Sequence, residues 1–484
     1  MSFHLSRKAI TRMQAILAIV IVIIAAVGGI YAYYTTLTPQ AGNPIKIALI
    51  PPLTGPAART GKELQDGVLF AYDELKAAGK IPVKVDGQLR DIQFMWVDSK
   101  SDPEEAVKAY TDAIVSGGAD ILGWNWHSSV AMALYKISTK YSKIHFGDVG
   151  ETQFLSLERA KNPDESKYWF KYWAAPPCYG SLFAPALEDA MKDVGFTPKT
   201  KTIAILLEDT DYGRGMGDAL KDAFAKAGWN VAYYDVFSLS PPESDFTPFI
   251  SKYKTAGVSV VYQISTGLPS MNAFLKQSYE AGLPALRGSF GIGWSSISEW
   301  YPALKEASDY VLSMDSNAII TTAQKDFVTR FQAAKGYAPS AVVAGYWGYD
   351  AFSMLIEGLN KAGTMNVDTL RRTLLDMEYK GIFMTTKFSE NANPPGTCCL
   401  GPMEIIADGD HFHFPLQQWK GGVATPIWPA AEAQGKLEIP PILAGAPGNF
   451  EVPPILAGTA GNFVTPPILA GAPGKFEVPS YLGG

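Results

Sequence analysis

The residues in this sequence whose spacing suggests chemistry are two pairs that contain histidine. His411 and His413 alternate on a probable strand, so both rings would face one side and could ligate a metal ion. A structural zinc site normally takes four ligands, and no third ligand of matching spacing is visible in the sequence. His127 and Ser128 do not form a nucleophile–base pair by sequence, because adjacent side chains seldom align for proton transfer. We therefore predict neither a metal site nor a catalytic pair.

Motifs of known catalytic chemistry are missing from the sequence. It contains no Walker loop, no Gly-x-Ser-x-Gly elbow and no His-Glu-x-x-His motif. Gly213-Arg-Gly-Met-Gly217 is a partial glycine pattern without the spacing of a dinucleotide fingerprint. We predict a protein that is not an enzyme and that uses no cofactor.

The elements that must position any site alternate between strand and helix from Ile45 onward, with short connections. Such alternation implies βαβ units and a parallel sheet that is covered on both faces. The expected elements are a strand over 45–50, a helix containing 64–75, a strand over 92–97, a helix from Pro103 through Ile114, and a strand over 120–123.

A second series of the same kind begins near Thr202, so two doubly wound α/β lobes are the economical architecture. Ligands in open α/β sheets bind beyond the carboxyl ends of the strands, and two such edges that face each other make a cleft. The expected elements are strands over 202–208, 231–236 and 258–263, and helices over 213–226, 246–254 and 271–280.

Composition limits the classes of protein to which this chain can belong. Its 484 residues exceed what one core usually holds, so two or more domains are expected. A net charge of -6 offers no basic surface for phosphates, and we predict no nucleic-acid partner. Cys178, Cys398 and Cys399 lack a Cys-x-x-Cys spacing, and the sequence leaves open whether Cys178 bonds to either vicinal cysteine.

An uncharged apolar stretch runs from Ala15 to Tyr34, after the cations Arg7, Lys8 and Arg12. We predict a transmembrane anchor there, with residues 1–14 in the cytoplasm, a linker over 35–44 and the rest of the chain at the extracytoplasmic face of the cell membrane. A cleaved signal peptide is the alternative.

The C-terminal tail, residues 423–484, contains an internal repeat. Prolines 440, 453, 466 and 479 recur every 13 residues, in units such as PPILAGAPGNFEV. The density of Gly and Pro opposes helix. The tail is either disordered or associates with a surface partner or another copy through its Ile-Leu and Phe positions.

The order of motifs between Ile45 and Gly422 resembles one family, the type I periplasmic binding proteins of the leucine/isoleucine/valine-binding group. IALIPPLTGPAARTGKELQDGVLFAYDEL resembles its first strand, turn and helix, WVDSKSDPEEAV its Asp-x-x-x-Asp-Pro segment, and LLEDTDYGRGMGDAL its Tyr-Gly-x-Gly helix start. LRGSFGIG and HFHFPLQQWKGG fall where the family has its second-lobe cleft loop and closing strand. The resemblance implies an extracytoplasmic protein that binds a small molecule and delivers it to the permease subunits of an ABC importer.

The resemblance also implies two Rossmann-like lobes joined by a three-stranded hinge. Hinge segments absorb the backbone change while each lobe moves as a rigid body. The implied crossings lie near 170–174, 312–315 and 381–384, which assigns 45–172 and 313–382 to lobe one and 173–312 and 383–422 to lobe two.

Ligand-contacting positions follow from the resemblance. The loop Gly123–Ser129 would hold a ligand carboxylate through His127 or Ser128, as an N–H-rich helix start favours an anion. The loop Gly147–Gly150 would bind an α-amino acid head group, and Tyr212 matches a ligand-contacting tyrosine of the family. The full set is Thr60, Trp126, His127, Ser128, Asp148, Val149, Gly150, Tyr212 and Phe290.

The sequence departs from amino-acid binders at Phe290, where they place the carboxylate that pairs with the ligand ammonium. Either Asp148 supplies the missing charge, or the solute is less polar or aromatic and is held by Trp126, Tyr212 and Phe290. Trp124 and Trp294 would make the cleft still more aromatic, although Trp124 could pack under its loop and Asp148 could cap a helix.

Two other functions are compatible with these features. The same fold serves as a ligand-sensing domain, so a receptor or regulatory subunit is one alternative, although few residues precede Ala15. A structural protein of the surface or of a filament is the other.

Overall fold

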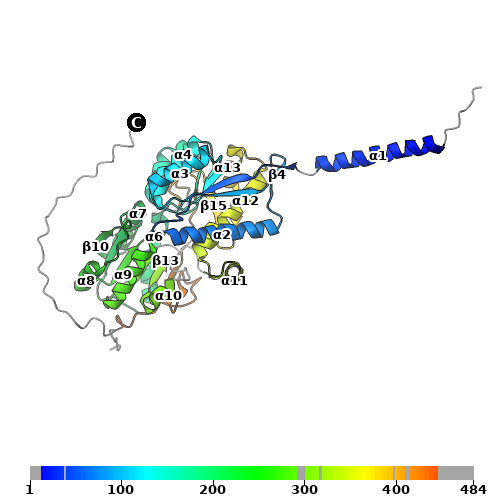
Figure 1. Ribbon diagram of the computed structural model, residues 1–484. Helices are drawn as coiled ribbons and strands as arrows, with labels where there is room; N and C mark the ends of the chain where they lie inside the picture. Colours follow the sequence, from blue (N-terminus) through cyan, green and yellow to red (C-terminus); the bar gives the residue numbers. More distant parts are fainter. Residues whose placement is uncertain are drawn as a thin grey trace, which may run out of the picture. The chain divides into compact units, whose positions relative to one another are not determined.

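The computed structural model describes residues 12–37, 40–290, 300–314, 319–395, 398–408, 411 and 414–444 (Figure 1). All the described elements lie within residues 1–446. Trp294, His413 and the repeats beyond residue 444 lie outside the described residues. The predictions made for them stay predictions.

The first large sheet has eight strands in the order β14-β15-β16-β8-β7-β6-β2-β5. The pairs that join β5, β2, β6, β7 and β8 are all parallel, as the alternating pattern predicts. Its strands are β2 (Ile45–Leu49), β5 (Ile92–Trp96), β6 (Ile121–Gly123), β7 (His145–Asp148), β8 (Trp169–Lys171), β14 (Glu378–Lys380), β15 (Thr385–Ser389) and β16 (Glu404–Ile405).

Helices from two separate stretches of sequence accompany this sheet, and Figure 1 shows them in blue, cyan and yellow. Capping side chains fix where two of these helices begin. Asp102 is the N-cap of the helix that starts at Pro103, and its side chain accepts from the N–H of Glu105. Thr321 and Gln324 form a capping box at the start of the helix that begins at Thr322. The helices are α2 (Ala58–Ala77), α3 (Pro103–Val115), α4 (Ser128–Lys140), α5 (Gln153–Lys161), α11 (Thr322–Lys335), the π-helix η4 (Ala341–Asp350), α12 (Ala351–Ala362) and α13 (Val367–Asp376).

The second large sheet has the order β10-β9-β11-β12-β13-β17-β18 and confirms the second series of elements that begins near Thr202. Green segments dominate this lobe in Figure 1. Its strands are β9 (Thr202–Glu208), β10 (Asn230–Phe237), β11 (Val260–Ile264), β12 (Leu286–Phe290), β13 (Leu312–Met314), β17 (Leu416–Lys420) and β18 (Val423–Trp428). Its helices are α6 (Pro176–Asp193), α7 (Asp211–Lys226), α8 (Thr247–Ala256), α9 (Leu268–Glu280) and α10 (Trp300–Leu304).

The chain crosses between the two sheets three times, and two crossings fall near their predicted positions. The first lies between β8 and β9 and the second after β13. The third was expected near Gly381–Met384, but this position is wrong. Because β15 turns back to pair with β14 and β16 then pairs with β8, the chain stays in the first lobe through Ile405. The last crossing lies between β16 and β17.

The N-terminal part of the described chain contains α1 (Arg12–Leu37) and a small sheet. Among the residues that the structure describes, none of the helices combines the length and the apolar character needed to cross a membrane. The anchor predicted over Ala15–Tyr34 is therefore not confirmed. The small sheet has the order β1-β4-β3 and comprises β1 (Gln40–Ala41), β4 (Gln88–Arg90) and β3 (Val83–Val85).

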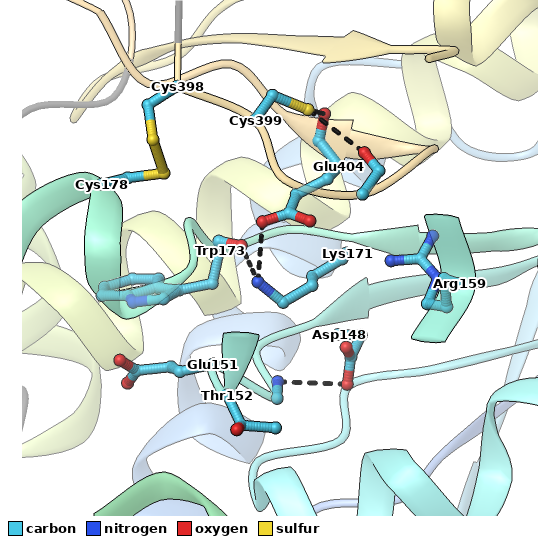
Figure 2. Close-up of polar contacts among 12 residues, drawn as sticks. Asp148, Glu151, Thr152, Arg159, Lys171, Trp173, Cys178, Cys398, Cys399 and Glu404 are labelled. Carbon is cyan, nitrogen blue, oxygen red and sulfur yellow. Dashed lines mark hydrogen bonds and ion pairs between the residues drawn. A yellow bond between two sulfur atoms is a disulfide. The ribbon is translucent and has the colours of Figure 1, made fainter. Parts of the chain in front are cut away.

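A disulfide joins Cys178 to Cys398 and decides the pairing that the sequence left open (Figure 2). Cys178 stands in the first turn of α6, in the second lobe, and Cys398 stands between β15 and β16, in the first. The bond therefore connects the two lobes beside their crossings. Cys399 keeps a buried thiol, and burial raises its pKa to about 12.

Candidate functional site

Two hydrogen bonds join the loop after β6 to the loop after β7. The N–H of Val149 donates to the carbonyl of Asn125 at 3.0 Å, and the N–H of Thr152 donates to Oγ of Ser128 at 3.0 Å. Because β6 and β7 are parallel neighbours, both loops leave the sheet at the same edge. The two bonds hold the residues between them, two on each loop, opposite one another.

Trp126 and His127 occupy this position on the first loop, and each has a buried polar atom that lacks a hydrogen-bond partner in the described part of the chain. These atoms are Trp126 Nε1 and His127 Nε2, on side chains that are 7% and 8% exposed. An unpartnered buried polar group costs free energy, so an acceptor between the lobes would be stabilising here. The Trp126 ring also lies 5.2 Å from that of Trp347, which gives the site an aromatic wall.

The first turn of α4 adds its partial positive charge to this donor set. His127 is the N-cap of α4, and its imidazole is neutral near pH 7 because burial lowers its pKa to about 4. A neutral ring can donate one N–H and carries no charge that would need a counter-ion. The loop is therefore suited to an anionic oxygen, as the sequence predicts for His127 and Ser128.

Gly150 lets the second loop pass directly over α4. A Cβ at this position would lie 2.4 Å from the Cβ of Ala131, a distance that real side chains do not show. The N–H of Gly150 donates to Oδ1 of Asp148 at 3.2 Å, so this N–H is already hydrogen-bonded within the protein. Val149 and Gly150 thus shape the site through the path of the backbone.

The charge-supplying role expected of Asp148 is not supported by its placement. Asp148 is fully buried, and its Oδ1 accepts from the Gly150 N–H (Figure 2) and from Asn125 Nδ2 at 2.8 Å. Its Oδ2 accepts from Trp169 Nε1 at 2.9 Å. Asp148 does not cap a helix either, since Thr152 is the N-cap of α5. It ties the two loops to β8.

Glu151 is the carboxylate that the sequence reasoning missed. It follows Gly150 on the second loop, in the segment opposite Trp126 and His127, and is 6% exposed. Its Oε2 accepts from the hydroxyl of Tyr179 on α6, and Figure 2 shows its side chain extending away from Asp148. The available signal was its position just beyond the end of β7, where a side chain can leave the sheet.

Two other predicted cleft residues lie beneath the loops. Trp124 is fully buried and donates Nε1–H to the carbonyl of Trp347 at 3.0 Å, and Trp347 donates its own Nε1–H to the carbonyl of Gly147. Trp124 therefore packs under its loop. Thr60 is 1% exposed in the first turn of α2, and the described hydrogen bonds do not connect it to either loop.

The second lobe presents the carboxyl ends of β9, β11 and β12. Tyr212 lies buried in the first turn of α7, and Phe290 ends β12, although its side chain is not among those described. Burial raises the pKa of Glu208, the last residue of β9, to about 7. Its oxygens accept from the hydroxyls of Thr210 and Thr266 at 2.7 and 2.9 Å, so Glu208 braces its own lobe.

The two lobes are in contact at the start of α5. A Cβ added to Gly215 on α7 would lie 2.5 Å from Gln153 Oε1 and 3.0 Å from Thr152 Oγ1. A larger residue at position 215 would require the side chains of Gln153 and Thr152 to move. The start of α5 in the first lobe is therefore packed closely against α7 of the second.

The described residues contain no candidate metal-binding site. No group of three or more His, Cys, Asp and Glu residues there could hold an ion. His411 contacts Asp408, with Nδ1 2.8 Å from Oδ1, and His413 lies beyond the described residues.

The protein has two α/β lobes that are in contact, and the loops between them offer unpartnered donors and a carboxylate. These features are those of a two-lobed solute-binding protein. Residues 44–410 match the model of the family described as periplasmic binding protein, and the chain belongs to this family. The family consists of extracytoplasmic substrate-binding proteins of ABC transporters, which are not enzymes.

Individual relatives support the assignment. The leucine-, isoleucine-, valine-, threonine-, and alanine-binding protein of Pseudomonas aeruginosa is 28% identical over 336 residues, which cover 69% of this chain and 83% of that protein. The leucine binding protein LivK of Thermotoga maritima is 18% identical with a TM-score of 0.63, over 79% of this chain and 98% of its own. A solute binding protein of an ABC transporter from R. palustris, solved with benzoate, is 22% identical with a TM-score of 0.62, over 81% and 97%. These two structures support the fold.

Proposed function

We propose that this protein captures a small zwitterionic solute of the amino-acid class outside the cell and delivers it to the permease subunits of an ABC importer. The observation that carries the proposal is the pair of hydrogen-bonded loops. The donors of Trp126 and His127 belong to the first of these loops, and Glu151 belongs to the second. Donors on one loop and an anion on the other suit a ligand that bears a carboxylate and an ammonium.

Glu151 takes the role that the sequence reasoning gave to Asp148. Asp148 ends β7 and is bound to Asn125 and Trp169 in the interior, whereas Glu151 stands on the loop, where its Oε2 accepts from the Tyr179 hydroxyl. A buried ammonium needs a counter-charge, since leaving it alone costs several kcal/mol. The name of the Pseudomonas aeruginosa relative, an amino-acid binder, supports the same class.

An aromatic carboxylic acid is the second candidate. The Trp126 and Trp347 rings lie 5.2 Å apart beside the donors and could receive a flat ring. The benzoate complex of the R. palustris protein shows that a protein of this fold can hold such a solute. In this case Glu151 would face no positive charge.

Calorimetric titration of the full chain with L-leucine, L-phenylalanine and 3-phenylpropionate separates the two candidates. We expect the amino acids to bind more tightly than 3-phenylpropionate, which lacks the ammonium. Glu151→Gln should weaken amino-acid binding by about 1.5–3 kcal/mol, roughly 10- to 150-fold, through loss of a charge-assisted hydrogen bond. Glu158→Gln, which changes a partly exposed carboxylate on α5 that pairs with Lys161, is the matched control.

Other results would decide against the proposal. Tighter binding of 3-phenylpropionate than of phenylalanine, with no effect of Glu151→Gln, selects the aromatic acid. Failure of every amino acid and every carboxylate to raise the melting temperature of the protein would contradict solute capture itself.

A further inference from the structure

The last described segment of the chain, residues 437–444, is hydrogen-bonded to strand β17 of the second lobe. The N–H of Glu438 donates to Oε1 of Gln418 at 2.7 Å, and Nε2 of Gln418 donates to the carbonyl of Glu438 at 2.9 Å. Gln418 lies in β17 and is 5% exposed, so its amide is fixed by the sheet. The Glu438 side chain also pairs with Lys420, two residues further along β17. The segment is therefore attached both through its backbone and through a charge.

The apolar side chains of this segment lie against the protein core. Leu437 is 4% exposed and Pro440 is buried, whereas Glu438 between them is exposed. Ile439 and Leu443 are partly buried and pack against the hydrophobic core. A turn ends the segment, in which the N–H of Leu443 donates to the carbonyl of Pro440 at 2.9 Å. The second lobe thus holds a short peptide whose apolar residues are buried and whose one charged residue is exposed.

The sequence of this peptide returns in the C-terminal repeats. Residues 437–444 read LEIPPILA, and residues 450–457 and 476–483 read FEVPPILA and FEVPSYLG. Phenylalanine replaces Leu437 and valine replaces Ile439, so a larger side chain at one position is matched by a smaller one two residues away. Alternate residues of an extended chain lie on one face, and a residue before proline is restricted to extended backbone. Because volume-conserving changes are tolerated well in cores, the later copies suit the same site.

One copy of the motif lacks the charged position. Residues 463–470 read FVTPPILA, with Val464 where the other copies have glutamate and Thr465 where they have isoleucine or valine. Val464 cannot pair with Lys420, and burying the Thr465 hydroxyl without a partner would cost free energy. This copy should therefore be the weakest ligand of the four, and it provides a natural control.

We propose that the surface of the second lobe around Gln418 and Lys420 is a peptide-binding site for this motif, and that the copies at 450–457 and 476–483 bind it on a second molecule of this chain. Each chain has one such site among its described residues, and its own residues 437–444 fill it. The later copies are therefore surplus ligands, and another molecule of the same chain offers a site of matching chemistry.

Binding to a second molecule proceeds by exchange, in which the incoming copy replaces the resident one. The number of docked motifs stays the same, so the exchange is driven by concentration. A resident copy on a short tether has an effective concentration on the order of millimolar. Exchange between molecules therefore requires a comparable local concentration of chains. This association is independent of the solute that the cleft binds.

Binding of labelled peptides to an acceptor form of the full chain, measured by fluorescence anisotropy, tests the site. The acceptor keeps Gln418 and Lys420 but weakens every resident copy of the motif through Leu437→Asp, Phe450→Asp, Phe463→Asp and Phe476→Asp. We expect the peptide FEVPPILAG to bind the acceptor with Kd on the order of 0.1–1 mM. It should bind the wild type at least 10-fold more weakly, because the resident segment fills the site. The peptide FVTPPILAG should bind the acceptor at least 5-fold more weakly than FEVPPILAG does.

Two further changes in the acceptor locate the bound peptide. Lys420→Gln should weaken FEVPPILAG at least 3-fold and leave FVTPPILAG unchanged, since only the former carries the glutamate. Gln418→Leu should weaken both peptides at least 5-fold, since it removes the paired hydrogen bonds to the peptide backbone. Circular dichroism and melting temperature check the fold of each variant, and Leu437→Ala replaces Leu437→Asp if the acceptor is unfolded. Equal binding of the two peptides, or no effect of either change, would overturn the proposal.

Sedimentation velocity of mixed chains tests the second molecule. The wild type and the acceptor should form a complex that neither forms alone, because the wild type supplies surplus motifs and the acceptor has a vacant site. Phe450→Asp/Phe476→Asp in the wild-type chain should abolish this complex, whereas Phe463→Asp should leave it intact. No complex with an acceptor that binds FEVPPILAG would rule out the second molecule. All these chains should bind solute equally, so a failure of solute binding would count against the proposed function alone.

Discussion

The N–H of Thr152 donates to Oγ of Ser128 at 3.0 Å, and both residues are buried. Ser128 begins α4 and Thr152 is the N-cap of α5, so one hydroxyl connects the starts of two helices that flank the ligand-binding loops. Thr152 Oγ1 is itself engaged, since it accepts from the N–H of Phe154. Together with the bond from the N–H of Val149 to the carbonyl of Asn125, this bond holds the two loops to each other.

Ser128→Ala should cost about 1–3 kcal/mol of unfolding free energy, because it leaves the buried N–H of Thr152 without an acceptor. Solute affinity should fall as well, since the second loop loses one of its attachments to the first. Urea unfolding and calorimetric titration measure the two effects. Ser138→Ala, on the same helix, is the control, as its hydroxyl only donates to the carbonyl of Tyr135 at 3.4 Å. Equal losses in the two variants would contradict the role of Ser128.

The sequence was sufficient to predict most of the fold but less of the site. Hydrophobic spacing identified α2, whose Leu64, Val68, Ala71 and Leu75 are all buried, and the second series from Thr202. The third crossing, which the family resemblance implied near 381–384, was misplaced, and a strand as short as β16 gives almost no periodic signal that could correct it.

The choice between Asp148 and Glu151 shows a second limit. The two carboxylates stand three residues apart, and a sequence does not tell which one points into the lobe and which one reaches the loop surface. Only the contacts with Asn125 and Trp169 assign Asp148 to the interior. The pairing of Cys178 was undecided for the same reason, since Cys398 and Cys399 are adjacent and their directions depend on the local backbone.

Lys171→Met should destabilise the protein by about 3–5 kcal/mol, because Lys171 and Glu404 form a fully buried ion pair at 3.0 Å (Figure 2). Removal of the lysine leaves the buried Glu404 carboxylate without its cation. It also leaves the carbonyl of Trp173 without the hydrogen bond that Lys171 donates. Adding Glu404→Gln should recover most of the loss. Urea unfolding measures it.

The exposed pair Lys201–Glu188, at 2.7 Å, is the control for this prediction. Lys201→Met should cost less than about 1 kcal/mol, since solvent screens exposed pairs. Similar losses for Lys171→Met and Lys201→Met, or no recovery in the double variant, would show that burial of the Lys171 pair carries no special cost.

Gly215→Leu should hinder closure of the two lobes without lowering the free energy of unfolding. Leucine favours a helix over glycine by roughly 0.5–1 kcal/mol, so the solute-free protein should be no less stable. A leucine side chain would collide with Gln153 and Thr152, because even a Cβ there lies 2.5 Å from Gln153 Oε1. Solute affinity should fall at least 10-fold. Small-angle scattering at saturating solute should show a larger radius of gyration than for the wild type. Lys221→Leu, an exposed position on α7, should leave both unchanged.

His127 gives the protein a dependence of stability on pH. Burial lowers its pKa from 6.5 to about 4, so between these values the unfolded chain binds a proton that the folded protein does not. Its contribution to stability is therefore complete above pH 6.5 and is lost as the pH falls to 4. Glu208 and Asp350 act in the opposite direction: burial raises the pKa of each to about 7, and their contributions are lost as the pH rises toward that value.

Comparison of the wild type with His127→Gln isolates the histidine from these opposing groups, which both proteins share. Glutamine keeps an amide donor in the loop but does not titrate. The difference in unfolding free energy between the two proteins should shift by about 3 kcal/mol against the wild type as the pH falls from 7 to 4, since the pKa difference sets the size of the effect. Urea unfolding at intervals of half a pH unit measures it. Parallel curves of unfolding free energy against pH would mean that the His127 ring accepts a proton in the folded state as readily as in the unfolded one. The assignment of His127 as a neutral donor to the ligand carboxylate would then be wrong.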